Sequence, residues 1–372
     1  MTVLYLFHSI ANWGGIERIL VDKMNYLADK YDLDVYLLTT DQGHNPIPFD
    51  LSSSIMYEDL GIFFYRKYRY HGFKRFLIAR KMLFEYEKLL KERLIKINPD
   101  IIICTTTDHI NSIAKYKGNT PLIVESHSIC SRTINGGKKW LLRKFYRERF
   151  LHSLSKVEVL VALTEGDAQE WRKYHHNVCV IPNFVHQHKF SVSGQDKKNV
   201  IVVGRFDYQK RVQDAIQIWR LVRERHPDWI LNIYGEGDMI EEIKKLASTV
   251  GNIVIHPPTS HIIQAYSDNN LLMMTSLFEP FGLVMLEAMS CGLPVIAFDC
   301  PYGPSDIITD GKNGFLIKER NFVDYADKVC MLMENRNARV EMGQNGMLSS
   351  HNFSPKHIMP LWKELFDKLL VN

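Results

Sequence analysis

The hydrophobic residues of the chain follow two alternating patterns. Short apolar runs, typical of buried parallel strands, are separated by longer segments in which apolar residues recur every three or four positions, as on one face of a helix. In the first half of the chain the predicted strands are TVLYLF, DVYLLT, DIIIC, LIVES, VEVLVAL and VCVIP. This alternation of strands and helices predicts an α/β domain with a doubly wound parallel sheet.

Two of the helical segments, residues 16–30 and 73–97, are long enough to be predicted with bounds. The second has apolar residues at helical spacing along its whole length. We expect these residues to form one stripe that faces the core: Phe76, Ala79, Leu83, Tyr86, Leu90, Leu94 and Ile97.

The pattern breaks at residues 183–199, NFVHQHKFSVSGQDKKN, which are polar and irregular and predict a linker. It then restarts with the apolar runs VIVVG, WILNIYG, NIVIH, LLMMT and LPVIAF. The 372 residues therefore predict two Rossmann-like domains, 1–185 and 186–372, that face each other across a cleft. The last helix, about 355–372, is a candidate to pack back on the N-terminal domain.

Composition excludes several classes of protein. Hydrophobic residues make up 46% and charged residues 24%, and the net charge of +4 is too mild for a nucleic-acid binder. The six cysteines form no CxxC pair, which argues against a disulfide framework and a zinc site. The N-terminus lacks a basic leader, and no apolar run reaches the ~18–20 residues of a membrane span. We expect a cytoplasmic protein.

An apolar segment near residue 280, SLFEPFGLVMLEAMSCGLPVIAF, contains two glutamates, Glu279 and Glu287. Pro280 suits the first turn of a helix and Gly292 suits its end, so a helix over about 280–290 is expected. A buried carboxylate without a partner is costly. Its partner is either a Lys or Arg from elsewhere in the fold or a ligand rich in hydroxyl groups.

A sugar nucleotide would satisfy this segment. Backbone N–H groups near the expected helix start, at Gly282–Val284, could bind a phosphate, and the carboxylates could bind hydroxyls on either side of it. The segment VVGRFDYQKRVQ offers a second half of the site, because a strand ends at Gly204, Arg205 follows, and Lys210 opens the next helix. Both cations could grip a diphosphate, although solvated basic residues are also common in loops.

These two segments resemble the GT4 family of retaining glycosyltransferases, which have the GT-B fold. GRFDYQK matches the family's G-R-x(4)-K element, and EPFGLVMLE matches its E-x(7)-E element. NWGGIER, ESHS and VIPNF extend the resemblance over most of the chain. Pro280 departs from the family, which commonly has Gly there.

The resemblance implies a role for each matched residue. Arg205 and Lys210 bind the donor diphosphate, Glu279 orients hydroxyls of the transferred sugar, and Glu287 binds the ribose. The donor site also includes the backbone of four residues at the expected helix start and three glycines at strand ends: Phe281, Gly282, Leu283, Val284, Gly14, Gly15 and Gly204.

The resemblance also implies residues near the acceptor and the reacting centre. Arg18 and Asn183 are candidate acceptor contacts, and His127 is expected beside the donor sugar but not as a general base. In the front-face route of such enzymes the leaving phosphate oxygen takes the acceptor proton. Without the resemblance, Gly14 and Gly15 read as a plain strand–helix turn, His127 as a structural histidine, and Asn183 as an ordinary turn residue.

Basic and aromatic residues alternate in two stretches, residues 65–84 and 136–150. From position 66 to 96 there are eleven Lys and Arg residues and three Glu. Either stretch alone is typical of a solvated helix face. The pair in one domain favours a peripheral contact with an anionic membrane surface at the inner face of the membrane, and no nucleic-acid recognition module is present.

The resemblance implies a retaining glycosyltransferase that moves a hexose (Gal, GalNAc, Glc or GlcNAc) from a UDP-sugar to a glycan or lipid-linked glycan acceptor in cell-surface polysaccharide synthesis. We expect no metal and no cofactor besides the donor. The alternatives are a GDP-mannose-dependent mannosyltransferase and a sugar-nucleotide epimerase or sensor of the same fold.

Overall fold

The computed structural model describes residues 1–106, 108–135, 140–187 and 197–371. It divides into two compact units. Unit 1 comprises Met1–Ile181 and Met359–Asn372, and unit 2 comprises Pro182–Ile358. The predicted boundary at 185/186 lies just beyond the end of the first segment, and most of the expected linker, 188–196, lies outside the described residues.

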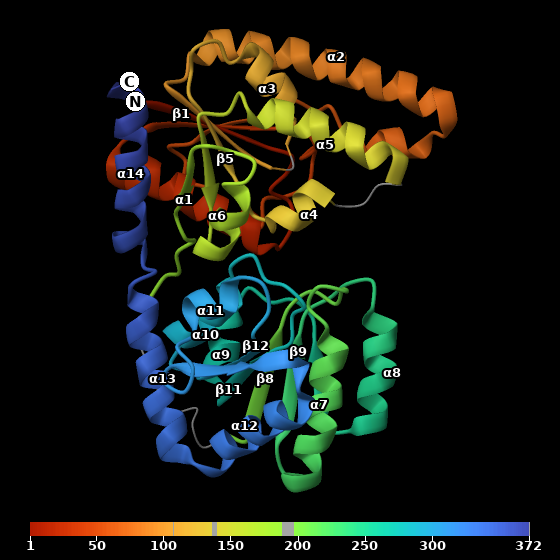
Figure 1. Ribbon diagram of the computed structural model, residues 1–372, viewed down its shortest axis with the longest axis vertical. Helices are drawn as coiled ribbons and strands as arrows, with labels where there is room; N and C mark the ends of the chain where they lie inside the picture. The colour runs from red at the N-terminus through yellow and green to blue at the C-terminus, as the bar shows by residue number, and fades with distance from the viewer. Residues whose placement is uncertain (107, 136–139, 188–196, 372) are drawn as a thin grey trace. The chain divides into compact units, whose positions relative to one another are not determined.

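Unit 1 is built on a seven-stranded parallel sheet with the order β3-β2-β1-β4-β5-β6-β7 (Figure 1). Its strands are β1 Thr2–Phe7, β2 Asp34–Thr39, β3 Met56–Asp59, β4 Ile101–Thr105, β5 Leu122–Glu125, β6 Val159–Ala162 and β7 Val178–Val180. Every apolar run predicted as a strand in this half contains one. Strand β3, MYED, was not predicted, because it lies at the sheet edge and lacks an apolar run.

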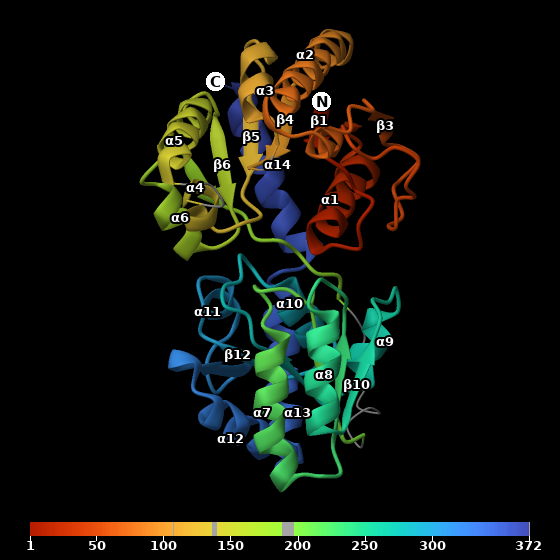
Figure 2. The same cartoon turned by 90° about the vertical axis from the view of Figure 1, so that its right-hand side faces the viewer.

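Helices cover both faces of this sheet. They are α1 Gly15–Tyr31, α2 Gly72–Ile97, α3 Ile110–Tyr116, α4 Cys130–Asn135, α5 Trp140–Leu154, α6 Glu165–Trp171 and α14 Pro355–Val371, with a short 3₁₀ helix, η1 Phe64–Arg69. Helices α2, α3 and α5 lie on one face, and α1 and α14 lie on the other (Figures 1 and 2). From Met359 onward, the last helix belongs to unit 1.

The predicted core stripe of α2 is wrong in its first half. Only Tyr86, Leu90 and Leu94 of this helix are buried, whereas Phe76 is 54% exposed. Helix α2 meets the core only from Met82 and Leu83 onward, and Phe73 and Phe76, at its N-terminal end, are exposed. The sequence pattern continues through both halves because an amphipathic face looks the same whether it meets a core or solvent.

Unit 2 has a six-stranded parallel sheet with the order β10-β9-β8-β11-β12-β13. Its strands are β8 Asn199–Val203, β9 Ile230–Tyr234, β10 Ile253–His256, β11 Leu271–Met274, β12 Val295–Phe298 and β13 Gly314–Ile317. The five predicted runs are all present as strands. Strand β13, a second edge strand, was missed because GFLI is short and begins with glycine.

The helices of unit 2 are α7 Val212–Arg225, α8 Ile240–Val250, α9 Ile262–Ser267, α10 Leu283–Ser290, α11 Gly303–Ile307, α12 Phe322–Glu334 and α13 Arg336–His351, with the 3₁₀ turn η3 Lys318–Arg320. Helices α7, α8 and α12 pack on one face of the sheet, and α10 and α13 pack on the other (Figures 1 and 2). All strands are parallel, so the loops that follow β8, β9, β11 and β12 emerge at one edge. Of the predicted donor-site residues, Gly204, Arg205 and Lys210 lie in the loop after β8, Glu279 lies in the loop after β11, and Glu287 lies in α10.

Candidate functional site

The loop between β8 and α7 carries the first group of predicted residues. Gly204 follows β8, and its N–H donates a hydrogen bond to the Tyr234 carbonyl at 3.1 Å. A Cβ atom on Gly235 would lie 2.0 Å from the Gly204 carbonyl oxygen, so the two loop backbones touch at a position where only glycine fits. Arg205 comes next, with its side chain 69% exposed and 3.2 Å from Asp207. This guanidinium is available to a ligand.

Lys210 and Glu279 form an ion pair in the middle of the site. The ammonium Nζ of Lys210 lies 2.5 Å from Oε2 of Glu279, and the Ser276 hydroxyl donates to the same oxygen at 3.3 Å. The two charged side chains are 17% and 8% exposed. A nearly buried carboxylate thus has a cation as its partner, which is the first of the two kinds of partner expected for this segment.

The backbone of Glu279 is fixed by the segment that follows β12. Its N–H donates to the Pro301 carbonyl at 2.7 Å, and its carbonyl accepts from Tyr302 at 3.0 Å and Gly303 at 2.8 Å. A Cβ atom on Gly303 would lie 1.9 Å from the Phe281 carbonyl oxygen. These contacts hold the Glu279 carboxylate at a defined position.

The expected helix over 280–290 is wrong at its start. Helix α10 begins at Leu283, and Gly282 is its N-cap with a φ of 104°, in the left-handed region that favours glycine. Glu279 and Pro280 therefore precede the helix. The backbone has to turn at Gly282 before the helix can start, which overrides the preference of Pro280 for a first helical turn.

The start of α10 provides N–H groups without an acceptor inside the helix, as every helix N-terminus does. Leu283 and Val284 are half-buried there, whereas Phe281 is buried and packs edge-on against Phe353, with ring centroids 5.8 Å apart. The four predicted residues 281–284 thus lie together at one helix end, directly after Glu279.

Glu287 has a partner that the sequence analysis missed. It lies in α10 and is 8% exposed, and its Oε2 accepts a hydrogen bond from the Tyr266 hydroxyl at 3.0 Å. Tyr266 is fully buried in α9. A phenol is one of the side chains that can satisfy a buried carboxylate without a charge, and nothing in the local pattern YSDNN marks this tyrosine as its partner.

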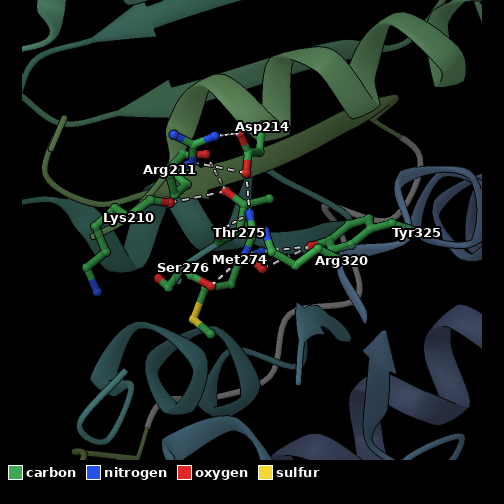
Figure 3. A network of polar contacts seen from close by, with 8 residues as sticks. All are labelled: Lys210, Arg211, Asp214, Met274, Thr275, Ser276, Arg320 and Tyr325. Atoms are coloured by element: carbon green, nitrogen blue, oxygen red, sulfur yellow. Dashed lines mark hydrogen bonds and ion pairs between the residues drawn. The ribbon is translucent and has the colours of Figure 1, made fainter. Parts of the chain in front are cut away.

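A polar network joins the loop that carries Lys210 to the end of β11 (Figure 3). The Thr275 hydroxyl donates to the carbonyls of Lys210 at 3.2 Å and Arg211 at 3.0 Å. Arg320 donates to the carbonyls of Ser276 at 3.1 Å and Thr275 at 3.2 Å. The network ties the two chain segments that bring Lys210 and Glu279 together.

Asp214 anchors the far side of this network. Its side chain is 2% exposed and forms ion pairs with Arg320 and with Arg211, the latter at 2.8 Å. Arg320 also lies 4.3 Å above the Phe298 ring. Figure 3 shows the Lys210 side chain extending away from these groups, so the network fixes the backbone of Lys210 and leaves its ammonium to Glu279.

Unit 1 holds the remaining predicted residues of the loop that follows β1. Gly14 is the N-cap of α1, and a Cβ atom there would lie 2.0 Å from Oε2 of Glu17, so the Glu17 side chain covers this glycine. Gly15 begins the helix, and Arg18 donates its N–H to the Gly14 carbonyl at 3.1 Å. The Arg18 guanidinium lies 3.9 Å from Asp22.

His127 lies two residues after the end of β5 and is nearly buried. Its Nε2 is 3.0 Å from Oε2 of Glu125, which also forms an ion pair with Lys23. Neither Lys23 nor Glu125 was predicted as a site residue, although a glutamate that ends an apolar strand is the same signal that drew attention to Glu287. Asn183, the last of the predicted residues, is buried in unit 2.

Two features of the described residues bear on metal ions and membranes. Within the described ranges, no group of three or more His, Cys, Asp or Glu side chains is placed to hold a metal ion. None of the helices in the part of the chain that the structure describes is both long and apolar enough to cross a membrane.

Known proteins match both halves of the chain. Residues 13–189 match the family model described as Glycosyltransferase Family 4, and residues 185–348 match the model described as Glycosyl transferases group 1. The amylovoran biosynthesis glycosyltransferase AmsD of Erwinia amylovora is 23% identical over 98% of this chain and 99% of its own length. The poly(ribitol-phosphate) alpha-N-acetylglucosaminyltransferase of Staphylococcus aureus is 31% identical over 58% of this chain, and the match spans 45% of that protein.

Solved structures share the architecture. A TarM variant from S. aureus, in complex with fondaparinux, alpha-GlcNAc-glycerol and UDP, matches with a TM-score of 0.79 and 20% identity, over 98% of this chain and 99% of that one. At this identity the likeness establishes the fold. The predicted GT-B architecture of two Rossmann-like domains is confirmed.

Proposed function

The chain belongs to the GT-B glycosyltransferases, and we propose that it is a retaining enzyme that moves a hexose from a UDP-sugar to a glycan or lipid-linked glycan acceptor in cell-surface polysaccharide synthesis. The observation that carries this proposal is the Lys210–Glu279 pair beside the start of α10. The names of AmsD and of the poly(ribitol-phosphate) transferase support the acceptor class. The UDP in the TarM complex supports the nucleotide.

In this proposal the donor replaces protein partners that the site already has. The diphosphate of the donor binds Lys210, which then no longer pairs with Glu279. The diphosphate also binds Arg205 and the backbone N–H groups at the start of α10. The freed Glu279 carboxylate then accepts hydrogen bonds from hydroxyls of the hexose, and Glu287 does the same for the ribose. Lys210 and Arg205 stabilise the negative charge that develops on the leaving diphosphate, so the proposed reaction needs no metal ion.

The transfer step breaks the bond between the anomeric carbon and the phosphate oxygen. A new bond forms from the acceptor oxygen to the same face of that carbon, and the acceptor proton moves to the departing diphosphate oxygen. The residues of unit 1 assigned to this step by resemblance are Gly14, Gly15 and Arg18 for the diphosphate and acceptor, and His127 for the sugar. Asn183 of unit 2 is proposed as an acceptor contact.

A donor panel tests this function. Purified protein is incubated with UDP-glucose, UDP-galactose, their N-acetyl forms and GDP-mannose, with and without a lipid-linked glycan acceptor, and the released nucleotide is measured. We expect release from one UDP-sugar that is lost in Glu279→Gln and kept in Glu241→Gln, which changes an exposed carboxylate of α8. Nucleotide release from GDP-mannose alone would show that the donor is GDP-mannose and not a UDP-sugar. Nucleotide binding without release in any mixture would favour a sensor.

The proposed location is the inner face of the membrane, and it rests on a surface of unit 1 that we call the aromatic–basic surface. Here η1 and the first half of α2 expose aromatic rings, namely Tyr65, Tyr68, Phe73, Phe76 and Phe84. Between these rings lie exposed cations: Arg66, Arg69, Lys74, Arg75, Arg80 and Lys81. Of the second basic stretch, residues 136–139 lie outside the described residues, and α5 exposes Phe145 and Tyr146.

An anionic bilayer is the partner that this chemistry fits. Aromatic side chains partition into the headgroup region, and each nearby Lys or Arg adds about 1 kcal/mol of attraction to anionic lipid. An acidic protein could pair with the cations. It would need a complementary groove to bury this many exposed aromatic rings. The aromatic–basic surface is therefore proposed to hold the enzyme at the lipid that carries its acceptor.

Sedimentation with phosphatidylcholine vesicles that contain phosphatidylglycerol tests this location. We expect binding that falls with added salt and falls at least tenfold in the double variant Phe73→Ser/Phe76→Ser. Ile95→Ser is the matched control, because Ile95 is an exposed apolar residue of the same helix outside the aromatic–basic surface. Equal binding by the wild type and the double variant, or no binding at low salt, contradicts the proposal.

A further inference from the structure

Three charged or ionisable side chains are buried together at the carboxyl end of β5. Lys23 of α1 and Glu125 of β5 form an ion pair in which the two side chains are 2% and 0% exposed. His127 lies 3.0 Å from the same carboxylate oxygen, Oε2, and is 5% exposed as a side chain. One oxygen atom of Glu125 therefore serves both partners. Its other oxygen, Oε1, is buried and has no hydrogen-bond partner among the described residues.

The charge state of Glu125 follows from these contacts. Burial by itself raises the pKa of a carboxyl group. The charge of Lys23 and the hydrogen bond from His127 outweigh this effect and lower the pKa of Glu125 to about 2. Glu125 is thus a carboxylate at neutral pH and can only accept hydrogen bonds.

A carboxylate acceptor determines which nitrogen of His127 carries a proton. Because Nε2 faces Oε2 of Glu125, this nitrogen has to be the donor. In a neutral imidazole the other nitrogen, Nδ1, is then an acceptor. The orientation and the tautomer of His127 both depend on a charge that Lys23 keeps ionised.

We propose that Lys23 and Glu125 are positioning residues for His127, which they hold as the Nε2–H tautomer so that Nδ1 accepts a hydrogen bond from a sugar hydroxyl. This inference rests on the proposed function for the role of His127 toward the sugar. The pairing itself, and the tautomer that it selects, do not depend on that function. An ion pair with no such task could be replaced by uncharged side chains at little cost.

The C-terminal helix completes this arrangement. The Lys23 ammonium lies 4.6 Å above the ring of Trp362, which belongs to α14 and is 2% exposed. A cation over an indole ring is attracted to its face. Trp362 thus limits the positions open to Lys23, and a residue far away in the sequence contributes to the placement of His127.

The test separates positioning from stability by restoring neutrality. Glu125→Gln leaves Lys23 buried without a charge partner, and we expect a lower Tm. The double variant Lys23→Met/Glu125→Gln contains no buried charge at this position and should recover most of that Tm. The glutamine amide can donate as well as accept, however, so it no longer selects the tautomer of His127.

We expect the kcat of the double variant to remain at least tenfold below that of the wild type even though its Tm is restored. Its KM for the donor should change less than threefold. The control is Lys117→Met/Glu158→Gln, which removes another ion pair of unit 1, at 2.7 Å, and should leave kcat unchanged. Recovery of both Tm and kcat in the Lys23→Met/Glu125→Gln protein would overturn the proposal, because the pair would then be structural alone.

Nitrogen-15 NMR of the imidazole groups provides a readout that needs no turnover. His127 is assigned by comparison with His127→Gln. We expect Nε2–H with unprotonated Nδ1 in the neutral imidazole of the wild type, and a mixture of tautomers in the double variant. An Nδ1–H tautomer in the wild type overturns the proposal. If the donor panel shows no transfer at all, the proposed function fails, and the tautomer result alone decides whether Lys23 and Glu125 position His127.

Discussion

Lys210 donates a hydrogen bond of 2.5 Å to Glu279, and both residues belong to the set that the sequence assigned to the donor. In the proposed function they bind different parts of one ligand, the diphosphate and the hexose. In the structure, each is the charge partner of the other. The pair therefore solves the problem of a nearly buried carboxylate beside an apolar helix, and binding must exchange one charge partner for another.

Replacement of Lys210 by methionine should lower kcat/KM for the donor by on the order of 10²–10³, because it removes a cation that meets the charge developing on the leaving group. Steady-state kinetics with the donor identified by the panel measure this loss. Lys244→Met is the matched control, since Lys244 pairs with the exposed Glu241 of α8 in the same unit. If kcat/KM of Lys210→Met differs from that of the wild type by less than threefold, this lysine has no role in the transfer step.

Gly235→Ala should distort the loop that carries Arg205. The added Cβ atom would lie 2.0 Å from the Gly204 carbonyl oxygen, and two backbones have to move apart. We expect the free energy of unfolding to fall by about 2–4 kcal/mol. Gly311→Ala is the control, because Gly311 has a φ of 73° but nothing within 4 Å of an added Cβ, so it should cost only about 1 kcal/mol.

Urea unfolding of the two glycine variants checks this difference. A similar loss in both would mean that backbone conformation, and not the contact with Gly204, accounts for the effect. UDP affinity, measured by calorimetry on folded protein, should fall in Gly235→Ala and stay unchanged in Gly311→Ala.

Arg320→Met should destabilise unit 2 by about 2–4 kcal/mol, because the buried Asp214 keeps only Arg211 and the carbonyls of Thr275 and Ser276 lose a donor. Methionine retains the apolar contact with Phe298. Arg225→Met is the control: Arg225 pairs with Asp327 at 2.7 Å on the surface, and its loss should cost less than about 1 kcal/mol. Equal unfolding free energies for the two variants would contradict the role given to the network of Figure 3.

The strands were predictable because their apolar runs are continuous, and parallel strands buried on both faces need such runs. Strands β3 and β13 escaped prediction because MYED contains no apolar run and GFLI is short and begins with glycine, whereas the other two edge strands, β7 and β10, have recognisable apolar runs. The first half of α2 shows the opposite case. Its apolar stripe was predicted to face the core, and the structure leaves Phe76, the first residue of that stripe, exposed.

The site was predictable where chemistry is concentrated in a short segment. Glu279, Glu287, Arg205 and Lys210 stand out because charges interrupt apolar runs or follow strand ends. Two residues around the site were not predictable. Tyr266 pairs with Glu287, and Arg320 donates to the carbonyls of Thr275 and Ser276; both come from other segments of the chain, and only the fold brings them close. The exact start of α10 depends on Gly282, whose left-handed backbone was not visible in the pattern.

Acid should weaken the protein through Glu125. Its pKa in the fold, about 2, lies below its usual value of 4.5, so the unfolded chain binds the proton more readily. The stabilisation is complete above pH 4.5 and is lost as the pH falls toward 2. Over this range it amounts to on the order of 3 kcal/mol. Burial lowers the pKa of the neighbouring Lys23 while the charge of Glu125 raises it, and burial raises the pKa of the Tyr5 hydroxyl, which stays neutral at acid pH.

The double variant Lys23→Met/Glu125→Gln isolates this contribution, because the other carboxylates titrate alike in both proteins. Urea unfolding at several pH values between 6 and 3 should show that the free energy of unfolding of the wild type falls relative to that of the variant as the pH drops below 4.5. The Lys117→Met/Glu158→Gln control should not show this relative change, because no comparable buried carboxylate is removed. A constant difference between the wild type and Lys23→Met/Glu125→Gln over this range would mean that Glu125 does not ionise differently in the folded and unfolded states.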